Sequence, residues 1–177
     1  LHDALPISTG GYICASPFPY DGIFRRAVLN FKFHNCGAYA ELLSHEMVRS
    51  IKDVYRDRKF DLVTCVPMHK DTLRERGYNQ AELLAKECAR LLGIEYADLL
   101  VKTKKNKTQH SIKAAERAKN VIGVYSPIDK NLIKGKRILI IDDIITTGST
   151  LGECARILNK CKCGEICCCT LCTSLLI

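Results

Sequence analysis

The segment 138–150, which reads ILIIDDIITTGST, concentrates the residue types that are most suited to chemistry. A small-residue turn that opens a helix presents consecutive backbone N–H groups and hydroxyls at the positive end of the helix dipole, which suits a phosphate monoester. Gly148 lets the backbone approach that phosphate closely. The carboxylates of Asp142 and Asp143 accept hydrogen bonds and suit two neighbouring sugar hydroxyls. Phosphate and diol together indicate a ribose phosphate, held by the two aspartates and by Thr146, Thr147, Gly148, Ser149 and Thr150.

A plainer interpretation of the same segment is a strand end followed by a capped helix. The unbroken order of an apolar run, two acids, two apolar residues and TTGST favours the ligand-binding interpretation. The chain has neither the G-x-x-x-x-G-K-[ST] pattern of a nucleoside-triphosphate loop nor the G-x-G-x-x-G pattern of a dinucleotide-binding fold. These two nucleotide-binding classes are therefore disfavoured.

The elements that must position this segment alternate between strands and helices. Apolar residues on both faces of 136–142 predict a buried strand of a parallel sheet, and the β-branched run 60–67 predicts a second one. Asn79 is the expected N-cap of the helix after that second strand, and Gly93 marks its end. The other expected elements are helices near 23–31, 40–54, 114–120 and 151–158, strands at 99–101 and 166–173, loops at 68–77 and 102–110, and a turn region at 127–135.

This alternation predicts an α/β fold with an open, mostly parallel sheet flanked by helices and with ligands beyond the carboxyl ends of the strands. No linker or internal repeat divides the chain, so residues 12–177 are expected to form a single domain. Residues 1–11 lack an initiator Met, show no periodicity and fit no targeting class. We therefore expect a non-native or disordered beginning.

Composition narrows the class of protein further. The 177 residues are 47% hydrophobic and 7% aromatic, which is enough for a core that needs no disulfide or metal staples. The longest apolar run is interrupted by Asp142 and Asp143, so a membrane span is excluded. Eleven cysteines are too few for a secreted disulfide scaffold, and an odd number cannot pair completely. A cytoplasmic location is expected.

Six of the cysteines crowd the C-terminus, at positions 161, 163, 167, 168, 169 and 172. Neighbouring residues of a strand alternate faces, so Cys168 is expected to point away from Cys167 and Cys169. Only Cys169 and Cys172 have C-x-x-C spacing, which is a weak basis for a zinc site. Core packing is the favoured interpretation, no metal ligand is assigned, and a metal or redox protein is the weakest functional hypothesis.

The net charge of +8 is unevenly distributed along the chain. Residues 102–119 hold seven Lys or Arg and one Glu, a net charge of +6. Such a run is a solvated face or a track for a nucleic-acid backbone. Both interpretations remain open at this point, and the second one uses Lys102, Lys104, Lys105 and Lys107 to bind single-stranded DNA.

Segment 138–150 resembles the phosphoribosyl-pyrophosphate signature of type I phosphoribosyltransferases. The surrounding chain, over about residues 12 to 174, resembles the ComF (GntX-like) family of that superfamily. The motifs that carry the resemblance occur in the family's order: CVPMH at 65–69, RERGYNQ at 74–80, LA at 84–85, Gln109, Arg117 with NV at 120–121 and, more loosely, Tyr20 with KF at 32–33. A cysteine-rich zinc module that commonly begins ComF proteins is absent from this sequence.

The resemblance implies a core sheet, a small hood near 12–35 and 102–125, and magnesium-bound phosphoribosyl pyrophosphate over the strand ends. The turn formed by Val66, Pro67, Met68 and His69 corresponds to the pyrophosphate loop. The stretch 74–80 corresponds to the catalytic loop, with Tyr78, Asn79 and Gln80 near the ligand. Arg74 and Arg76 suit the departing pyrophosphate, because a guanidinium fork matches phosphate oxygens. With Asp142 and Asp143 they form the expected catalytic set.

Two functions follow from the resemblance. The first is a phosphoribosyltransferase of nucleoside metabolism, a pentosyl-transferring glycosyltransferase with Mg²⁺ as cofactor and an unidentified acceptor. The alternative is a non-catalytic accessory protein that binds single-stranded DNA and acts with the competence and DNA-uptake machinery. The first predicts saturable binding of the pyrophosphorylated sugar with Mg²⁺, and the second predicts salt-sensitive binding of single-stranded DNA.

Overall fold

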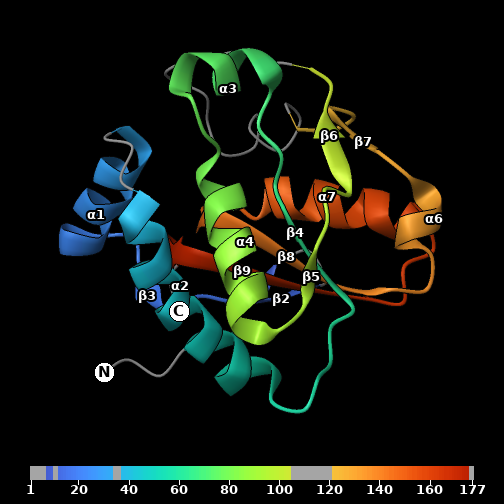
Figure 1. Cartoon of the computed structure of the whole chain (residues 1–177), viewed down its shortest axis with the longest axis horizontal. Helices are drawn as coiled ribbons and strands as arrows, with labels where there is room; N and C mark the ends of the chain where they lie inside the picture. Colours follow the sequence, from blue (N-terminus) through green and yellow to red (C-terminus); the bar gives the residue numbers. More distant parts are fainter. Residues whose placement is uncertain (1–6, 10–11, 34–36, 105–120, 176–177) are drawn as a thin grey trace.

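The computed structural model describes residues 7–9, 12–33, 37–104 and 121–175 (Figure 1). The strands are β1 (Ile7–Thr9), β2 (Tyr12–Ala15), β3 (Phe18–Pro19), β4 (Leu62–Cys65), β5 (Glu95–Tyr96), β6 (Leu100–Lys102), β7 (Tyr125–Pro127), β8 (Arg137–Ile145) and β9 (Glu165–Thr173). The helices are α1 (Gly22–Phe33), α2 (Gly37–Tyr55), α3 (Lys70–Arg76), α4 (Gln80–Leu92), α6 (Lys130–Ile133) and α7 (Ser149–Lys160).

The main sheet has seven strands in the order β1-β2-β9-β8-β4-β5, and β3 also pairs with β9. Every pair is parallel except β1 with β2. Strand β8 occupies the centre, where Ile138 lies beside Leu62 of β4 on one edge and beside Ile166 of β9 on the other. The predicted open, mostly parallel sheet is confirmed.

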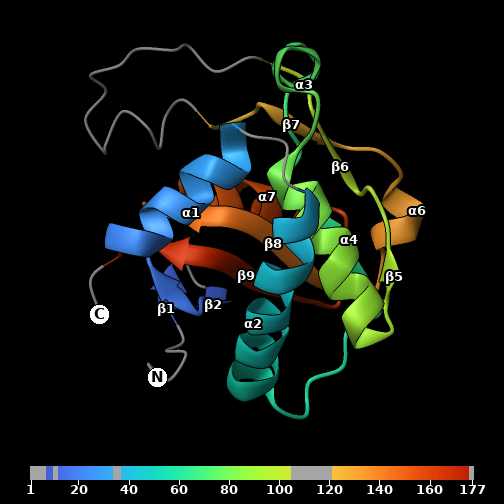
Figure 2. The same cartoon turned by 60° about the vertical axis from the view of Figure 1, so that its left-hand side comes forward.

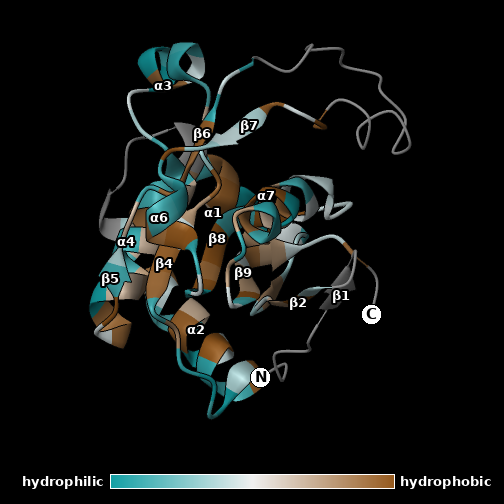
Figure 3. Ribbon diagram, turned by 90° about the vertical axis from the view of Figure 1, so that its right-hand side faces the viewer, coloured by the Kyte–Doolittle hydropathy of each residue, from teal (hydrophilic) through white to brown (hydrophobic). Residues whose placement is uncertain are grey.

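Helices cover both faces of this sheet (Figure 2). Leu139 and Ile141 of β8 pack with α1, α2 and α4, whereas Ile138 and Ile140 pack with α7 on the other face. Because side chains of a strand alternate, a central strand needs apolar residues at successive positions to fill both interfaces. Figure 3 shows the hydrophobic colouring of β4 and β8 between the helix layers.

The cysteines of β9 follow the same alternation. Cys167 and Cys169 pack on the α2 and α4 side, and Cys168 packs on the α7 side, as predicted. Burial raises the pKa of the Cys14 thiol, on the neighbouring strand β2, to about 12. Within the described part of the chain, no group of three or more Cys, His, Asp or Glu side chains is arranged to hold a metal ion. These thiols act as small core side chains.

The structure differs from the sequence-based expectation in five places. The loop expected at 68–77 contains α3, and the turn region at 127–135 contains the end of β7 and α6. Strand β8 continues past Asp142 to Ile145, because β9 pairs with it over that length. Segment 12–19, expected in the hood, joins the main sheet through β2 and β3. Within 1–11, β1 forms a strand against β2, while the rest of that segment and the expected helix at 114–120 lie outside the described residues.

No helix among the described residues combines the length and the apolar character that a membrane crossing needs.

Candidate functional site

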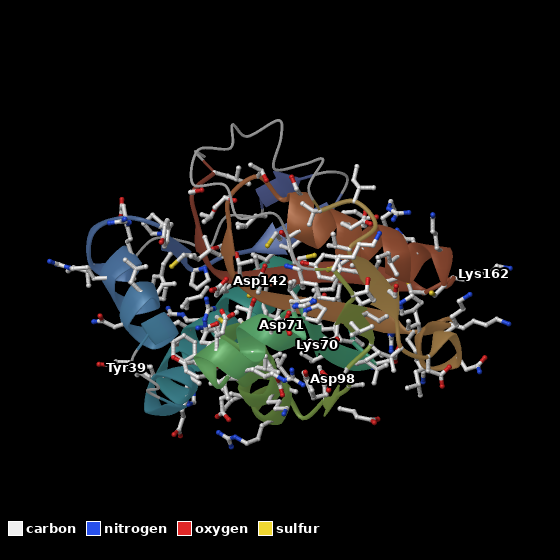
Figure 4. All side chains as sticks on the ribbon, turned by 90° about the horizontal axis from the view of Figure 1, so that it is seen from above. Tyr39, Lys70, Asp71, Asp98, Asp142 and Lys162 are labelled. Carbon is white, nitrogen blue, oxygen red and sulfur yellow. The ribbon has the colours of Figure 1, made fainter. Side chains whose placement is uncertain are left out.

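The carboxyl end of β8 delivers two carboxylates to the upper edge of the sheet. Asp142 and Asp143 are both partly exposed, in contrast to the fully buried Ile141 before them. A carboxylate oxygen of Asp142 accepts a hydrogen bond from the backbone N–H of Asp143 at 2.9 Å. Seen from above, Asp142 lies toward the centre of the molecule, whereas Tyr39 and Lys162 lie at its periphery (Figure 4). The two acids are thus presented to solvent at the middle of the fold.

The turn after β8 has the geometry of an anion-binding loop. Gly148 takes a left-handed conformation, with φ of 73°, and directly precedes α7. This conformation is readily available to glycine, and turns of this kind can present backbone N–H groups to an anion. The hydroxyls of Thr147 and Ser149 contact each other at 2.8 Å. Residues 144–151 and Asp142 line a small hollow at this helix N-terminus, so the predicted phosphate ligands lie together.

The turn after β4 lies beside the end of β8. Val66 N–H donates to the carbonyl of Ile141 at 2.9 Å, which extends the β4–β8 pairing to the edge of the sheet. His69 then caps α3, its ring Nδ1 accepting from the N–H of Asp71 at 3.3 Å. His69 is only 9% exposed, so a packed imidazole holds the turn 66–69 in place.

Asn79 connects this turn to the helix that follows. Its side-chain oxygen accepts from the N–H of Ala81 at 3.2 Å and caps α4, as predicted. Its side-chain nitrogen donates to the carbonyl of Val66 at 3.1 Å. The side chain is 7% exposed. One amide therefore satisfies a helix N-terminus and the backbone of the 66–69 turn together.

The residues of 74–80 separate into three environments. Arg76 faces the cleft beside the aspartates and donates to the side chain of Gln80 at 3.0 Å, whereas Arg74 is exposed on α3 and does not line the cleft. Tyr78 donates its hydroxyl to the carbonyl of Phe31, so it anchors α1. Arg76 is therefore the better placed of the two arginines to meet a ligand.

A two-stranded hairpin, β6 with β7, covers the other side of the site. Lys102 pairs with Tyr125 in the register of this hairpin, and its ammonium lies 5.5 Å from the centre of that ring. Burial lowers the pKa of Lys102. The hairpin is tied to α7 because buried Glu153 accepts from the N–H of Gly123 at 2.8 Å. Hydrogen bonds from Arg156 lower the pKa of Glu153 and keep it charged.

Most of these parts contribute to one cleft of about 350 Å³. Its walls come from the ends of β4 and β8, from α3, from the start of α4 and from the β6–β7 hairpin. The predicted site residues that line it are Val66, Pro67, Met68, His69, Arg76, Asn79, Gln80, Asp142, Asp143 and Thr150. Thr146, Thr147, Gly148 and Ser149 line the adjoining hollow, which shares Asp142 and Thr150 with the cleft.

The structure also brings in residues that the sequence did not assign to this site. Lys102, expected in a nucleic-acid track, is half-buried and lines the cleft with Tyr125, whereas Lys104 is exposed. Lys105 and Lys107 lie outside the described residues. Thr72 of α3 lines the cleft as well. The sequence carried no signal for Thr72, since it stands in a segment without periodicity.

Comparison with known proteins agrees with this geometry. The family described as "Phosphoribosyl transferase domain" matches residues 79–175, which include α4, the hairpin, β8 and the turn after it. The chain belongs to this phosphoribosyltransferase family. The expected resemblance is confirmed: the matched residues include Asp142, Asp143 and the turn 146–150, whereas the turn 66–69 and Arg76 precede them.

Individual relatives of this phosphoribosyltransferase domain are named for competence and DNA utilization. The present chain is 33% identical to competence protein F of Haemophilus influenzae over 144 residues, which are 78% of this chain and 63% of that protein. It is 31% identical to competence protein ComFC of Bacillus subtilis, over 85% of this chain and 60% of that protein. The chain is also 30% identical to DNA utilization protein YhgH of Escherichia coli, over 56% of this chain and 44% of that protein. The chain thus spans less than two thirds of the length of these relatives.

Solved structures show the same fold. A glutamine phosphoribosylpyrophosphate amidotransferase from B. subtilis, complexed with ADP and GMP, superposes with a TM-score of 0.52 at 19% identity, over 76% of this chain and 26% of that one. An allosteric regulatory enzyme of purine biosynthesis gives a TM-score of 0.50 at 21% identity, over 76% of this chain and 25% of that one. At these identities the likeness concerns the fold.

The two hydrogen-bonding roles of Asn79 are separable by mutation. Asn79→Ala removes the α4 cap and leaves the carbonyl of Val66 unpaired, so we expect the free energy of unfolding to fall by about 1–3 kcal/mol in urea titrations. Asn79→Asp keeps the capping oxygen and is expected to lose less. Asn131→Ala, on an exposed helix face, is the control and should change the value by less than about 0.5 kcal/mol. Equal effects at both positions would contradict the connecting role of Asn79.

Proposed function

We propose that this protein binds magnesium-phosphoribosyl pyrophosphate and transfers its phosphoribosyl group to an acceptor. The supporting observation is the single cleft that joins the carboxyl ends of β4 and β8, where the turn 66–69, Asp142 with Asp143, and the adjoining turn 146–150 meet. Each part suits a different portion of one ligand. A sugar with phosphate groups at both ends spans these parts.

The ribose phosphate is assigned to the end of β8. The N–H groups and hydroxyls of 146–150, at the N-terminus of α7, take the 5-phosphate, where the helix dipole favours negative charge. The adjacent carboxylates of Asp142 and Asp143 accept hydrogen bonds from the two ring hydroxyls. Because these groups are fixed by strand pairing and by the helix start, the sugar is oriented before the reaction.

Magnesium fits this cleft as a cation shared with the ligand. Mg²⁺ prefers oxygen ligands and retains several waters, so two carboxylates together with phosphate oxygens suffice. Asp142 and Asp143 are the oxygen donors that would hold it, since both line the cleft and are partly exposed. The pyrophosphate oxygens and waters would complete the coordination of the ion. When bound, the ion supplies charge neutralisation to the departing pyrophosphate.

The remaining walls suit the departing pyrophosphate and the acceptor. Arg76, positioned by Gln80, presents a guanidinium to the pyrophosphate side of the cleft, near the turn 66–69. Transfer at the anomeric carbon develops positive charge on the sugar ring, which the carboxylates of Asp142 and Asp143 stabilise electrostatically. Lys102 and Tyr125 of the hairpin face the same cleft and form the wall assigned to the acceptor.

Loss of the two carboxylates tests ligand binding. The double substitution Asp142→Asn and Asp143→Asn keeps side-chain size but removes both negative charges and one acceptor oxygen from each side chain, so we expect the affinity for the sugar pyrophosphate with Mg²⁺ to fall at least about tenfold in calorimetry. The matched control is Glu41→Gln with Glu46→Gln, which removes two exposed carboxylates from α2. No measurable binding by the unchanged protein would overturn the proposal.

Transfer is tested separately, by pyrophosphate release. With Mg²⁺ and the sugar pyrophosphate present, we expect release to depend on one member of a panel of purines, pyrimidines and amines. Arg76→Ala should slow that release, because charge on the leaving group is then less well stabilised, whereas the exposed Arg74→Ala should have the smaller effect. Binding without release for every acceptor would support a non-catalytic protein.

The names of the relatives support a second candidate, a role in DNA uptake with the competence machinery. We propose that the basic run 102–119 supplies the contact to single-stranded DNA. Its net charge of +6 suits a phosphate backbone, whose binding through lysines is sensitive to salt.

Neutralising three lysines of that run provides the test. Lys104→Ala, Lys105→Ala and Lys107→Ala together should weaken binding of a fluorescent oligothymidylate and reduce the slope of affinity against salt concentration by about 2–3. The control is Lys130→Ala, Lys134→Ala and Lys160→Ala, which removes the same charge elsewhere. Binding that is absent, or that does not respond to salt, would contradict this role.

A further inference from the structure

A second cleft, of about 410 Å³, lies at the opposite end of the main sheet. It is built from the end of α2, the segment that leads into β4, the end of α4 and the first residue of β8. Arg137 lines this cleft and Asp142 lines the first, and the five steps along β8 from one residue to the other separate them by about 16 Å. No part of the proposed transfer reaction uses this cleft.

The floor of the second cleft is aromatic and aliphatic. Phe60 is partly exposed, and its ring meets that of Tyr55 edge to face at 5.7 Å between centroids. Tyr55 is held rigidly, since its hydroxyl lies 2.6 Å from the carbonyl of Cys168 and 2.8 Å from that of Ile13. Leu92 and Ile94 complete the floor. A flat, apolar group suits such a surface.

The rim is cationic. Five basic side chains line the cleft: Lys52, Arg56, Arg58, Lys59 and Arg137. Two of them are neutralised at one wall, where Arg58 pairs with Glu165 and Arg137 pairs with Asp61. For Lys52, Arg56 and Lys59, the described residues provide no carboxylate partner. Three exposed positive charges therefore surround an aromatic floor.

Arg56 lies at the rim of the second cleft in an unusual backbone conformation. It directly follows α2 and has a positive φ of 42°, in the left-handed region that usually favours glycine at a helix C-terminus. A non-glycine residue in this conformation carries backbone strain. The guanidinium of this arginine lies at the mouth of the cleft.

The charges around the cleft favour a compact anion over a long polyanion. Asp53 and Asp57 alternate with the basic residues on the exposed outer surface, and Asp61 and Glu165 stand at the opposite wall. A nucleic-acid strand that extended beyond the cleft would meet these acids. A ligand of the cleft's own size meets only the cationic rim and the aromatic floor.

From these features we propose that the second cleft binds a free nucleoside monophosphate, with its base on Phe60 and its phosphate on Lys52, Arg56 and Lys59. Guanidinium and ammonium groups make charge-assisted hydrogen bonds to phosphate oxygens. An aromatic ring stacks on any base, so the cleft selects for a phosphorylated, flat ligand more than for one base. This site is independent of the proposed transfer reaction.

The test uses calorimetry with AMP as the probe, in the Asp142→Asn and Asp143→Asn protein, so that the first cleft is impaired. We expect AMP to bind there with about one equivalent. Adding Lys52→Ala and Lys59→Ala should weaken AMP binding at least about tenfold, while Lys130→Ala with Lys134→Ala should leave it unchanged. Phe60→Leu keeps an apolar floor and should weaken AMP binding without altering the response to inorganic phosphate.

Three results would overturn the proposal. One is the absence of AMP binding to the Asp142→Asn and Asp143→Asn protein when the unchanged protein binds it, which would assign AMP to the first cleft. Another is an affinity that does not respond to Lys52→Ala with Lys59→Ala. The third is binding of oligothymidylate, but not AMP, that depends on those two lysines, which would assign the cleft to a nucleic-acid strand. Because each readout is taken with the first cleft impaired, none depends on phosphoribosyl transfer.

Discussion

The pairing of β8 on both of its edges is the constraint on which the rest of the structure depends. Ile138, Leu139, Ile140 and Ile141 are fully buried and pair with β4 on one side and β9 on the other. A strand that is enclosed by two neighbours and two helix layers has one register that buries its apolar residues. The position of its carboxyl end follows from that register. Asp142, Asp143 and the turn to α7 are therefore delivered to a fixed place.

The two clefts use the ends of this strand in opposite ways. At the carboxyl end, partly exposed acids and the start of α7 face a cleft that is closed by α3 and the β6–β7 hairpin. At the amino end, Arg137 is held by Asp61, whose pKa the guanidinium keeps well below its usual range. Basic side chains dominate there. A single sheet thus carries two clefts of different chemistry, one that we propose for a sugar that also needs hydroxyl acceptors and one that we propose for a flat phosphorylated ligand.

Local patterns in the sequence predicted the core and much of the first cleft. The continuous apolar run before Asp142 identified β8, and the Asn79 cap identified α4, because both signals depend on residues close together in the chain. Helix α3 was missed because it has no buried residue and so no apolar stripe, and its ends are defined only by His69 and Gly77. The place of Lys102 was missed for another reason: it depends on pairing with Tyr125, 23 positions along the chain. The second cleft also depends on contacts between distant segments, α2, α4 and β8, so no local sequence motif indicates it.

The central claim is that one sugar pyrophosphate occupies the cleft at the carboxyl ends of β4 and β8. A crystal structure of the protein with Mg²⁺ and phosphoribosyl pyrophosphate tests it most directly. The account predicts the 5-phosphate against the turn 146–150, the ring hydroxyls at Asp142 and Asp143, and the pyrophosphate toward the turn 66–69 and Arg76. Density for the ligand elsewhere on the surface, or a sugar whose hydroxyls face away from both aspartates, would contradict it.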